Sequence, residues 1–305
     1  MEPTPDATPD AAPDAAAPSE SPGVGARALP DTLPPPLQGF ELTHPAVPPG
    51  LDGFRILHIA DLHARARSGL RGPRRPRAMN ALLAGLRGLK VDLACLTGDY
   101  ADRAGDEQAA ADLVLELVGA IDARLGVAGS FGNHDHQRAR DQLRRRVPAV
   151  RWLDNAHADI APLRLIGTGE PEDLLAATLS GPPDGTTDGP PRFTIALAHD
   201  PIAIFPASDL SIPLVLSGHT HGGQIRTGPR RLFHTSTDLR GHEATGAIAR
   251  RDTICCITRG IGVTVLALRI NCPPQACVYT LRTADNSRPA RERPEDAALR
   301  TLLAW

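Results

Sequence analysis

Two histidines in a glycine-rich stretch are the residues of this sequence best suited to chemistry. His219 and His221 lie in the sequence GHTHGGQ at positions 218–224, directly after the apolar run at 212–216. Side chains two positions apart on an extended backbone point to one face, and the neighbouring glycines let the chain turn there. Both imidazoles could therefore face one crevice and bind a metal ion. A single His-x-His pair is more often a solvated turn, so a metal site requires further ligands elsewhere in the chain.

Four earlier apolar runs also end in side chains that can bind metals. Asp, Asn and His are the hard and borderline ligands that suit divalent first-row metals. In open α/β sheets ligands bind just beyond the carboxyl ends of the strands, so five strand ends could face one crevice. The runs at 54–60, 91–96, 127–131 and 193–198 precede Asp61-Leu62-His63, Thr97-Gly98-Asp99, Gly132-Asn133-His134-Asp135 and His199-Asp200, in that order. Five such ends in series indicate a single metal centre.

The segments between these runs have the spacing of helices. Residues 76–89 and 106–125 carry apolar side chains at intervals of three and four, which predicts helices with one buried face. Strands that alternate with helices are typical of α/β proteins. After His221 the pattern becomes one of short apolar runs between Gly and Pro turns. It predicts β-strands at 224–226, 253–257, 263–268 and 276–281.

Composition sets the bounds of the folded domain. Of the 305 residues 41% are hydrophobic, which is enough for a core. Residues 1–37 are mainly Pro, Ala, Asp, Thr and Ser, so we expect a disordered extension that cannot bury enough apolar surface to fold. We expect one domain at 38–283. Residues 284–305 form a polar tail, in which 297–303 could make a short helix.

Charge, cysteines and hydropathy exclude several classes of protein. The net charge is −2 and no aromatic residues alternate with the basic ones, so we expect no nucleic-acid partner. Five cysteines are an odd number, which argues against a disulfide framework. No window approaches the roughly 18 apolar residues that a membrane span requires, and none resembles a secretory signal. We therefore expect a cytoplasmic protein that could be peripheral to the inner membrane.

Arginines cluster after the first and third of these motifs. Their planar guanidinium groups could form a basic rim for a phosphorylated or anionic-lipid substrate. Because Lys90 is the only lysine, the arginines could equally be the ordinary surface charges of this chain. The two clusters are Arg65, Arg67, Arg71, Arg74, Arg75 and Arg77, and then Arg138, Arg140, Arg144, Arg145 and Arg146.

The series of motifs resembles that of the calcineurin-like metallophosphoesterase superfamily. The resemblance spans about residues 38–282 and keeps the order of the motifs. It implies the metallo-dependent phosphatase fold, a four-layer α/β/β/α sandwich with two mixed β-sheets. It also implies that metal-activated water hydrolyses a phosphodiester, phosphomonoester or pyrophosphate bond. The GHTHGGQ stretch and residues 258–262 resemble a bacterial branch of membrane-associated phosphodiesterases, near which some proteins cleave the pyrophosphate of a UDP-linked diacylglucosamine.

The resemblance assigns a role to each candidate residue. Two divalent cations are implied, with manganese favoured and iron, zinc, cobalt or nickel as alternatives. His134 would protonate the leaving group, and Asp135 would accept its other ring N–H. The ligands would be Asp61, His63 and His221 for the first cation, Asp99 as the bridge, and Asn133, His199 and His219 for the second.

Three functions remain open at this stage. The first is hydrolysis of a lipid-linked phosphate ester, with peripheral membrane contact. The second keeps the enzyme but changes the substrate to a nucleotide or another small soluble ester. The third is a binding scaffold that has lost activity, and the presence of all seven implied ligands together with His134 favours an enzyme over it. The sequence leaves the oligomeric state open.

Overall fold

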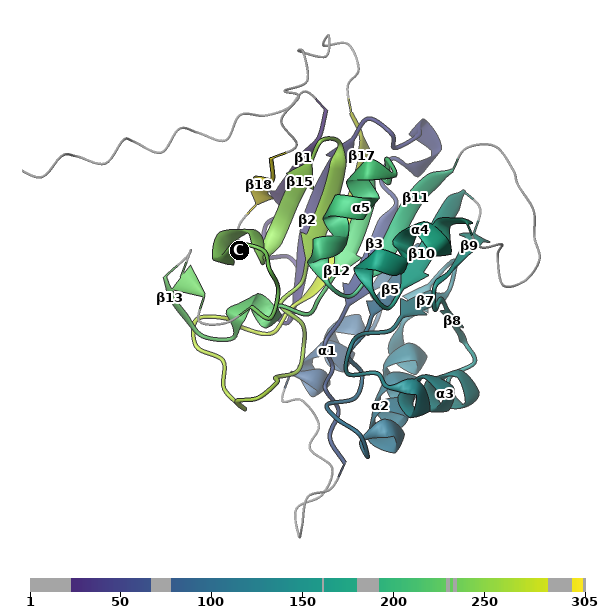
Figure 1. The fold of residues 1–305 in the computed structure, drawn as a ribbon, viewed down its shortest axis with the longest axis vertical. Helices are drawn as coiled ribbons and strands as arrows, with labels where there is room; N and C mark the ends of the chain where they lie inside the picture. Colours follow the sequence, from purple (N-terminus) through teal and green to yellow (C-terminus); the bar gives the residue numbers. More distant parts are fainter. Residues whose placement is uncertain are drawn as a thin grey trace, which may run out of the picture.

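Two seven-stranded β-sheets lie face to face at the centre of the computed structural model (Figure 1). The structure describes residues 23–66, 78–160, 162–179, 192–228, 231–232, 235–284 and 298–303. The first sheet contains, in spatial order, β1 (Gly25–Ala28), β2 (Leu37–His44), β17 (Ala276–Thr283), β3 (Arg55–Ile59), β5 (Leu93–Thr97), β7 (Val127–Ser130) and β8 (Val150–Trp152). The second contains β18 (Arg300–Leu303), β15 (Gly246–Arg250), β16 (Thr253–Ile257), β12 (Leu214–Ser217), β11 (Phe193–Ala198), β10 (Leu163–Thr168) and β9 (Ala156–Ile160).

Both sheets are mixed, with a parallel centre. β3, β5, β7 and β8 run parallel in the first sheet, whereas β17 is antiparallel to β3. β10, β11, β12 and β16 run parallel in the second sheet, flanked by antiparallel β9 and β15. The carboxyl ends of the parallel strands therefore meet at one edge of each sheet. Two further pairs are small: β4 (Lys90–Val91) with β6 (Asp122–Ala123), and β13 (Arg226–Gly228) with β14 (Arg231–Leu232).

Helices cover the outer face of each sheet. On the first sheet lie α1 (Met79–Leu86), α2 (Glu107–Ala120) and α3 (Gln137–Arg146), and their apolar faces form one core with that sheet. On the second lie α4 (Leu174–Leu179) and α5 (Ile204–Asp209), with a smaller core. A third core fills the space between the sheets. These layers confirm the expected α/β/β/α sandwich.

The central strands are continuous apolar runs because both of their faces are buried. In β5 and β7 every residue is buried, as in β12 and β16. Parallel strands covered on both sides typically have such sequences rather than alternating ones. This is why the sequence located the central strands well.

The ends of the domain and one later segment differ from expectation. β1 lies within the stretch that we expected to be an extension, and it pairs with β2. The expected short helix at 297–303 is wrong, since β18 pairs there with β15. The expected strand at 263–268 is also wrong, because those residues form an irregular loop. Residues 1–22 lie outside the described part of the chain. Among the described residues no helix combines the length and apolar character needed to cross a membrane.

Candidate metal centre

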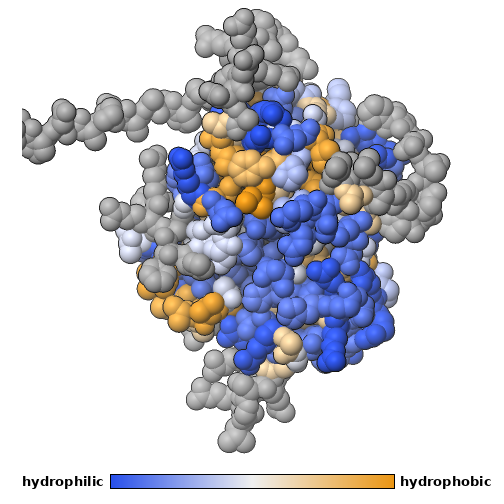
Figure 2. Space-filling model, in the orientation of Figure 1, coloured by the Kyte–Doolittle hydropathy of each residue, from blue (hydrophilic) through white to orange (hydrophobic). Residues whose placement is uncertain are grey.

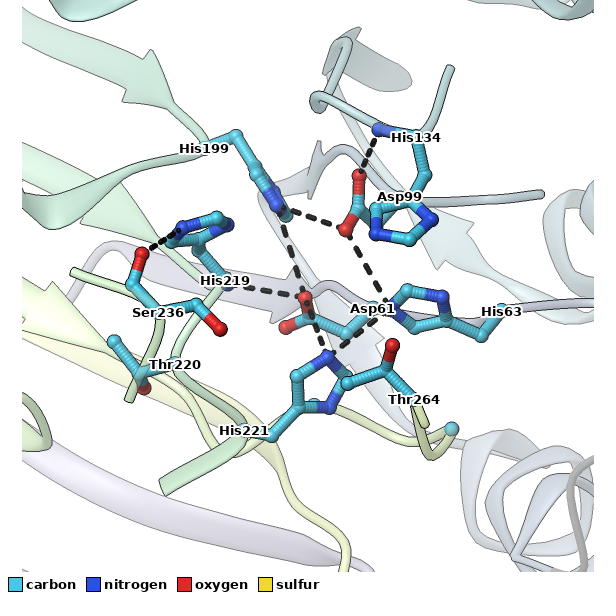
Figure 3. A network of polar contacts seen from close by, with 12 residues as sticks. Asp61, His63, Asp99, His134, His199, His219, Thr220, His221, Ser236 and Thr264 are labelled. Carbon is cyan, nitrogen blue, oxygen red and sulfur yellow. Dashed lines mark hydrogen bonds and ion pairs between the residues drawn. The ribbon is translucent and has the colours of Figure 1, made fainter. Parts of the chain in front are cut away.

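Six of the seven predicted ligands form two neighbouring groups. Each residue of a group offers a ligand atom within 4.8 Å of the others. Figure 3 shows the two carboxylates surrounded by the four imidazole rings. The groups are Asp61, His63 and His221, and Asp99, His199 and His219. Asn133, the seventh, is exposed on the loop after β7, and its place as a ligand stays a prediction.

The carboxyl ends of five parallel strands deliver these side chains. Asp61 and His63 follow β3, and Asp99 follows β5. His199 follows β11, and the GHTHGGQ stretch follows β12 in the second sheet. The loop after β7 brings in His134. The centre therefore lies where the carboxyl edges of the two sheets meet, and each sheet supplies ligands to both groups.

Five of the six ligands have left-handed backbone conformations. Asp61, Asp99 and His221 have φ of 54°, 55° and 50°. His63 and His219 have φ of 42° and 70°. Such conformations are uncommon for residues other than glycine and each costs of order 1 kcal/mol or more. Sharp turns at the strand ends aim the side chains into the centre, and the surrounding fold maintains them.

Glycines let the backbone approach both carboxylates closely. A Cβ added at Gly218 would lie 2.5 Å from Oδ2 of Asp61, and one at Gly260 would lie 2.6 Å from the same atom. A Cβ at Gly132 would lie 2.2 Å from Oδ1 of Asp99. No larger residue fits at these positions without displacing a ligand. The glycines of the motifs thus leave room for the two carboxylates, and they also permit the turns.

Asp99 reaches both groups through one oxygen atom. Its Oδ2 lies 3.1 Å from Nε2 of His199, which belongs to its own group. The same Oδ2 lies 3.4 Å from Nε2 of His63, in the other group. Its Oδ1 accepts the backbone N–H of His134 at 3.0 Å, which fixes the orientation of the carboxylate. The carboxylate of Asp99 thus lies between the two groups, and its role as a bridging ligand stays a prediction.

Outer hydrogen bonds set the tautomers of two ligands. Nδ1 of His199 lies 2.7 Å from the carbonyl oxygen of Thr97, and Nε2 of His219 lies 2.7 Å from that of Ser236. A carbonyl can only accept, so these nitrogens carry the protons and the other ring nitrogens are free to bind a cation. Such outer contacts are typical of metal-binding histidines.

The donor set fits a pair of divalent cations. The Nε2 atoms of His63 and His221 face each other at 3.0 Å, and Oδ1 of Asp61 lies 3.6 Å from Nε2 of His221. Two carboxylates and four imidazoles, with no thiolate, suit manganese, iron, zinc, cobalt or nickel. A cation bound between these atoms would separate the facing nitrogens and accept electron pairs from them.

The pKa values of the buried groups show how the carboxylates depend on positive charge. Burial raises the pKa of Asp61, and the negative charge of Asp99 raises it further. Burial lowers the pKa of His199, but the charge and hydrogen bond of Asp99 outweigh this and raise it to about 10. In the metal-free protein, a proton on His199 therefore offsets part of the negative charge of the carboxylates, and a bound cation would replace that proton.

His134 lies beside the ligands and has a different ring partner from the one we predicted. Its Nδ1 lies 2.6 Å from the carbonyl oxygen of Asp102, so Nδ1 carries the proton and Nε2 is free. The ring is half-buried and stands edge-on to His63, with the ring centroids 4.9 Å apart. A backbone carbonyl in the loop after β5 leaves no trace in a sequence pattern.

The predicted pairing of Asp135 with His134 is wrong. The carboxylate of Asp135 is fully buried and turns under the loops, where it accepts the backbone N–H groups of Gly132, Asp99, Tyr100 and Ala101 at 2.8–3.2 Å. Burial and the charge of Asp99 raise the pKa of Asp135 to about 6. Asp135 thus holds together the loops that carry Asp99 and His134. It does not make the predicted contact with the imidazole of His134.

Arg269 contacts the backbone of the candidate centre, and the sequence motifs did not point to it. Its guanidinium group donates to the carbonyl oxygens of Gly262, Arg259 and His221 at 2.6, 2.7 and 3.2 Å. It joins the backbone of the predicted ligand His221 to the segment at 259–262. The strand expected at 263–268 ends just before this arginine, so no sequence pattern pointed to it.

Several described arginines of the two clusters are engaged in ion pairs. Arg65 pairs with Asp102 at 3.0 Å. On α3, Arg140 and Arg144 both pair with Asp154, at 2.9 and 2.5 Å. For these three residues, ion pairing explains the clusters better than a free basic rim. The rest of the first cluster, from Arg67 to Arg77, lies outside the described residues.

A family model and two relatives all indicate that this chain is similar to phosphoesterases. The model of a family described as calcineurin-like phosphoesterase matches residues 54–223, which include every predicted ligand. The chain is 30% identical over 217 residues to the uncharacterized metallophosphoesterase YkuE of Bacillus subtilis (strain 168), covering 64% of this chain and 70% of that protein. It is 29% identical over 204 residues to the phosphodiesterase YaeI of Escherichia coli (strain K12), covering 63% and 71%.

Proposed function

The chain belongs to the calcineurin-like phosphoesterase family and is a metal-dependent phosphoesterase, and on that premise we propose that it hydrolyses phosphodiester bonds with two cations. The observation that carries this proposal is the position of Asp99. Its Oδ2 lies within 3.4 Å of a histidine from each ligand group. One bridging carboxylate between two groups of imidazoles is what a two-metal site needs.

The residues divide into two sets around this bridge. Asp61, His63 and His221 hold the first cation in our proposal, and His199, His219 and Asn133 join Asp99 at the second. When bound, the cations would clamp the phosphoryl oxygens and activate a water as nucleophile. We favour manganese, because oxygen and imidazole donors without thiolate suit it.

His134 is the proposed general acid. Its Nδ1 proton is held by the Asp102 carbonyl, so its Nε2 is the atom that can give a proton to the leaving-group oxygen. The imidazole is half-buried at the edge of the centre and can reach a substrate. The proposed role of His134 does not require it to bind a cation, whereas the proposed roles of the surrounding histidines do.

Two observations bear on the substrate. The relative YaeI is named a phosphodiesterase, which supports a diester over a monoester or a pyrophosphate. Exposed aliphatic side chains lie in the segment that Arg269 joins to the backbone of His221, which favours a lipid-linked ester over a nucleotide or another soluble one.

The proposal is tested with soluble chromogenic esters and the manganese-loaded protein. We expect bis(p-nitrophenyl) phosphate to be hydrolysed faster than p-nitrophenyl phosphate or a UDP-sugar, as judged by kcat/KM. A preference for the monoester or the pyrophosphate would contradict the assignment. The chelated protein should be inactive and should recover when manganese is restored.

A further inference from the structure

Exposed aliphatic side chains are concentrated in one loop of the molecule. Among the described residues five large hydrophobic side chains are exposed, and Leu115 on α2 is the only one outside residues 265–270. We call residues 263–271 the aliphatic loop. In Figure 2 an orange patch covers its position at the lower left. The exposed fractions are 87% for Val265, 50% for Leu266, 49% for Leu268 and 43% for Ile270.

Polar contacts hold the aliphatic loop firmly. The Gln224 side chain donates to the carbonyl of Thr264 at 3.0 Å and accepts its N–H at 2.9 Å. The backbone N–H of Ile270 donates to Gln224, and that of Arg226 donates to Ile270. Arg269 points inward to the carbonyls of Gly262 and other residues. The polar groups of the loop thus face the protein while the aliphatic ones face outward.

The backbone conformation of Val265 directs its side chain into solvent. Its φ is 51°, an uncommon conformation that is costly for a β-branched residue. Its side chain gains no burial within the domain in compensation, because it is 87% exposed. A turn that strains the backbone and directs a valine into solvent indicates an apolar environment outside the protein.

The aliphatic loop borders the metal centre. Arg269 joins it to the backbone carbonyl of the ligand His221. Gln224, which grips Thr264, belongs to the same glycine-rich stretch as that ligand. A molecule whose apolar part rests on the loop would have its polar end near the cations.

We propose that the aliphatic loop inserts into the surface of a phospholipid bilayer, so that the metal centre acts on a phosphate ester held in the membrane. The inference rests on the proposed function, since it names where the substrate resides. A few aliphatic side chains are enough for reversible binding at the boundary of head groups and acyl chains. They fall short of the roughly 20–30 residues that each side of a stable protein interface uses. Residues 263–271 contain no Asp or Glu that lipid phosphates would repel.

Vesicle binding by the full chain tests this directly. We expect the protein to sediment with phosphatidylcholine vesicles. A variant with Val265→Ser, Leu266→Ser and Leu268→Ser should have an affinity for the vesicles that is lower by a factor of roughly ten or more. Leu115→Ser removes the other exposed aliphatic residue, on α2, and should bind like the wild type. Equal binding by the triple variant, or no binding by the wild type, would overturn the proposal.

A gain-of-signal variant guards against misfolding of the triple variant. Val265→Trp places a fluorophore at the most exposed position of the loop. Brominated phosphatidylcholine should quench it more strongly than it quenches the wild-type tryptophans. Quenching no greater than in the wild type would overturn the proposal. So would a concentration-dependent dimer that the serine substitutions abolish, because a second copy would then cover the loop.

Activity separates this inference from the proposed function. The ratio of the rate on a vesicle-borne phosphodiester lipid to the rate on a soluble diester should fall in the triple variant. Hydrolysis of the soluble diester without vesicle binding would overturn the loop assignment and leave the proposed function standing. Vesicle binding without hydrolysis of any ester would overturn the proposed function and support the loop as a membrane contact.

Discussion

At the scale of single residues, the proposed mechanism gives His134 proton transfer and no part in metal binding. Its ring contacts the Asp102 carbonyl, its backbone N–H donates to the Asp99 carboxylate, and its Nε2 is available to a substrate. Replacement with His134→Gln should lower kcat by roughly 10²–10⁴-fold and leave the metal content unchanged. Metal analysis and turnover of the same preparation check this.

The neighbouring His136 is a matched control for that substitution. It is exposed on the same loop, and His136→Gln should retain wild-type turnover. If His134→Gln lost metal in proportion to its rate, His134 would act as a ligand. An unchanged kcat would remove it from the mechanism.

We propose that Arg269 positions the predicted ligand His221, because its guanidinium group donates to the backbone carbonyl of that residue. Lysine keeps the charge but cannot reach three carbonyl oxygens with a planar fork. We expect Arg269→Lys to weaken metal binding by roughly 10–100-fold, as loss of outer contacts to metal ligands commonly does. Competitive titration with a fluorescent chelator measures this. Arg251→Lys, at an exposed ion pair with Asp209, should leave the affinity unchanged.

At the scale of elements, the pairing of β3 with β5 buries His58. This histidine is fully buried, and its Nε2 lies 2.8 Å from Oγ1 of Thr97. Burial lowers its pKa from 6.5 to about 3. Between these values the unfolded chain takes up a proton that the folded one does not. Stability therefore falls as the pH drops from about 6.5 to 3, by up to about 4 kcal/mol from this group.

Replacing His58 should remove this part of the pH dependence. His58→Gln keeps a polar group near Thr97 and does not titrate. Urea unfolding at a series of pH values should give the variant a shallower loss of stability below pH 6.5 than the wild type. If the free energy of unfolding fell equally steeply below pH 6.5 in both proteins, His58 would not be the cause of this pH dependence.

The elements also show what the sequence could predict. Continuous apolar runs located the central strands, and the Asp and His residues that follow them lie together because parallel strands end at one edge. The Asp102 carbonyl could not be foreseen, since every residue has one. The apolar pattern of Val265 and Leu266 predicted a strand, but Arg269 and Gln224 bind this segment in place of a neighbouring strand.

At the scale of the whole molecule, the metal centre joins the two sheets. The first sheet supplies Asp61, His63 and Asp99, and the second supplies His199 and the GHTHGGQ histidines. Bound cations should stabilise the folded state, by about 2.7 kcal/mol at a concentration of 100 times Kd. Thermal unfolding with manganese and after chelation should show a higher Tm for the loaded protein. An equal Tm would mean that the sheets do not depend on the centre.

The central claim is that Asp99 bridges two cations, and metal analysis of Asp99→Asn tests it most directly. The account predicts two metal ions per wild-type chain, at least one fewer in Asp99→Asn, and a diesterase rate reduced by more than roughly 10³-fold. A control, Asp141→Asn on the exposed face of α3, should match the wild type. Two ions and undiminished turnover in Asp99→Asn would contradict the account.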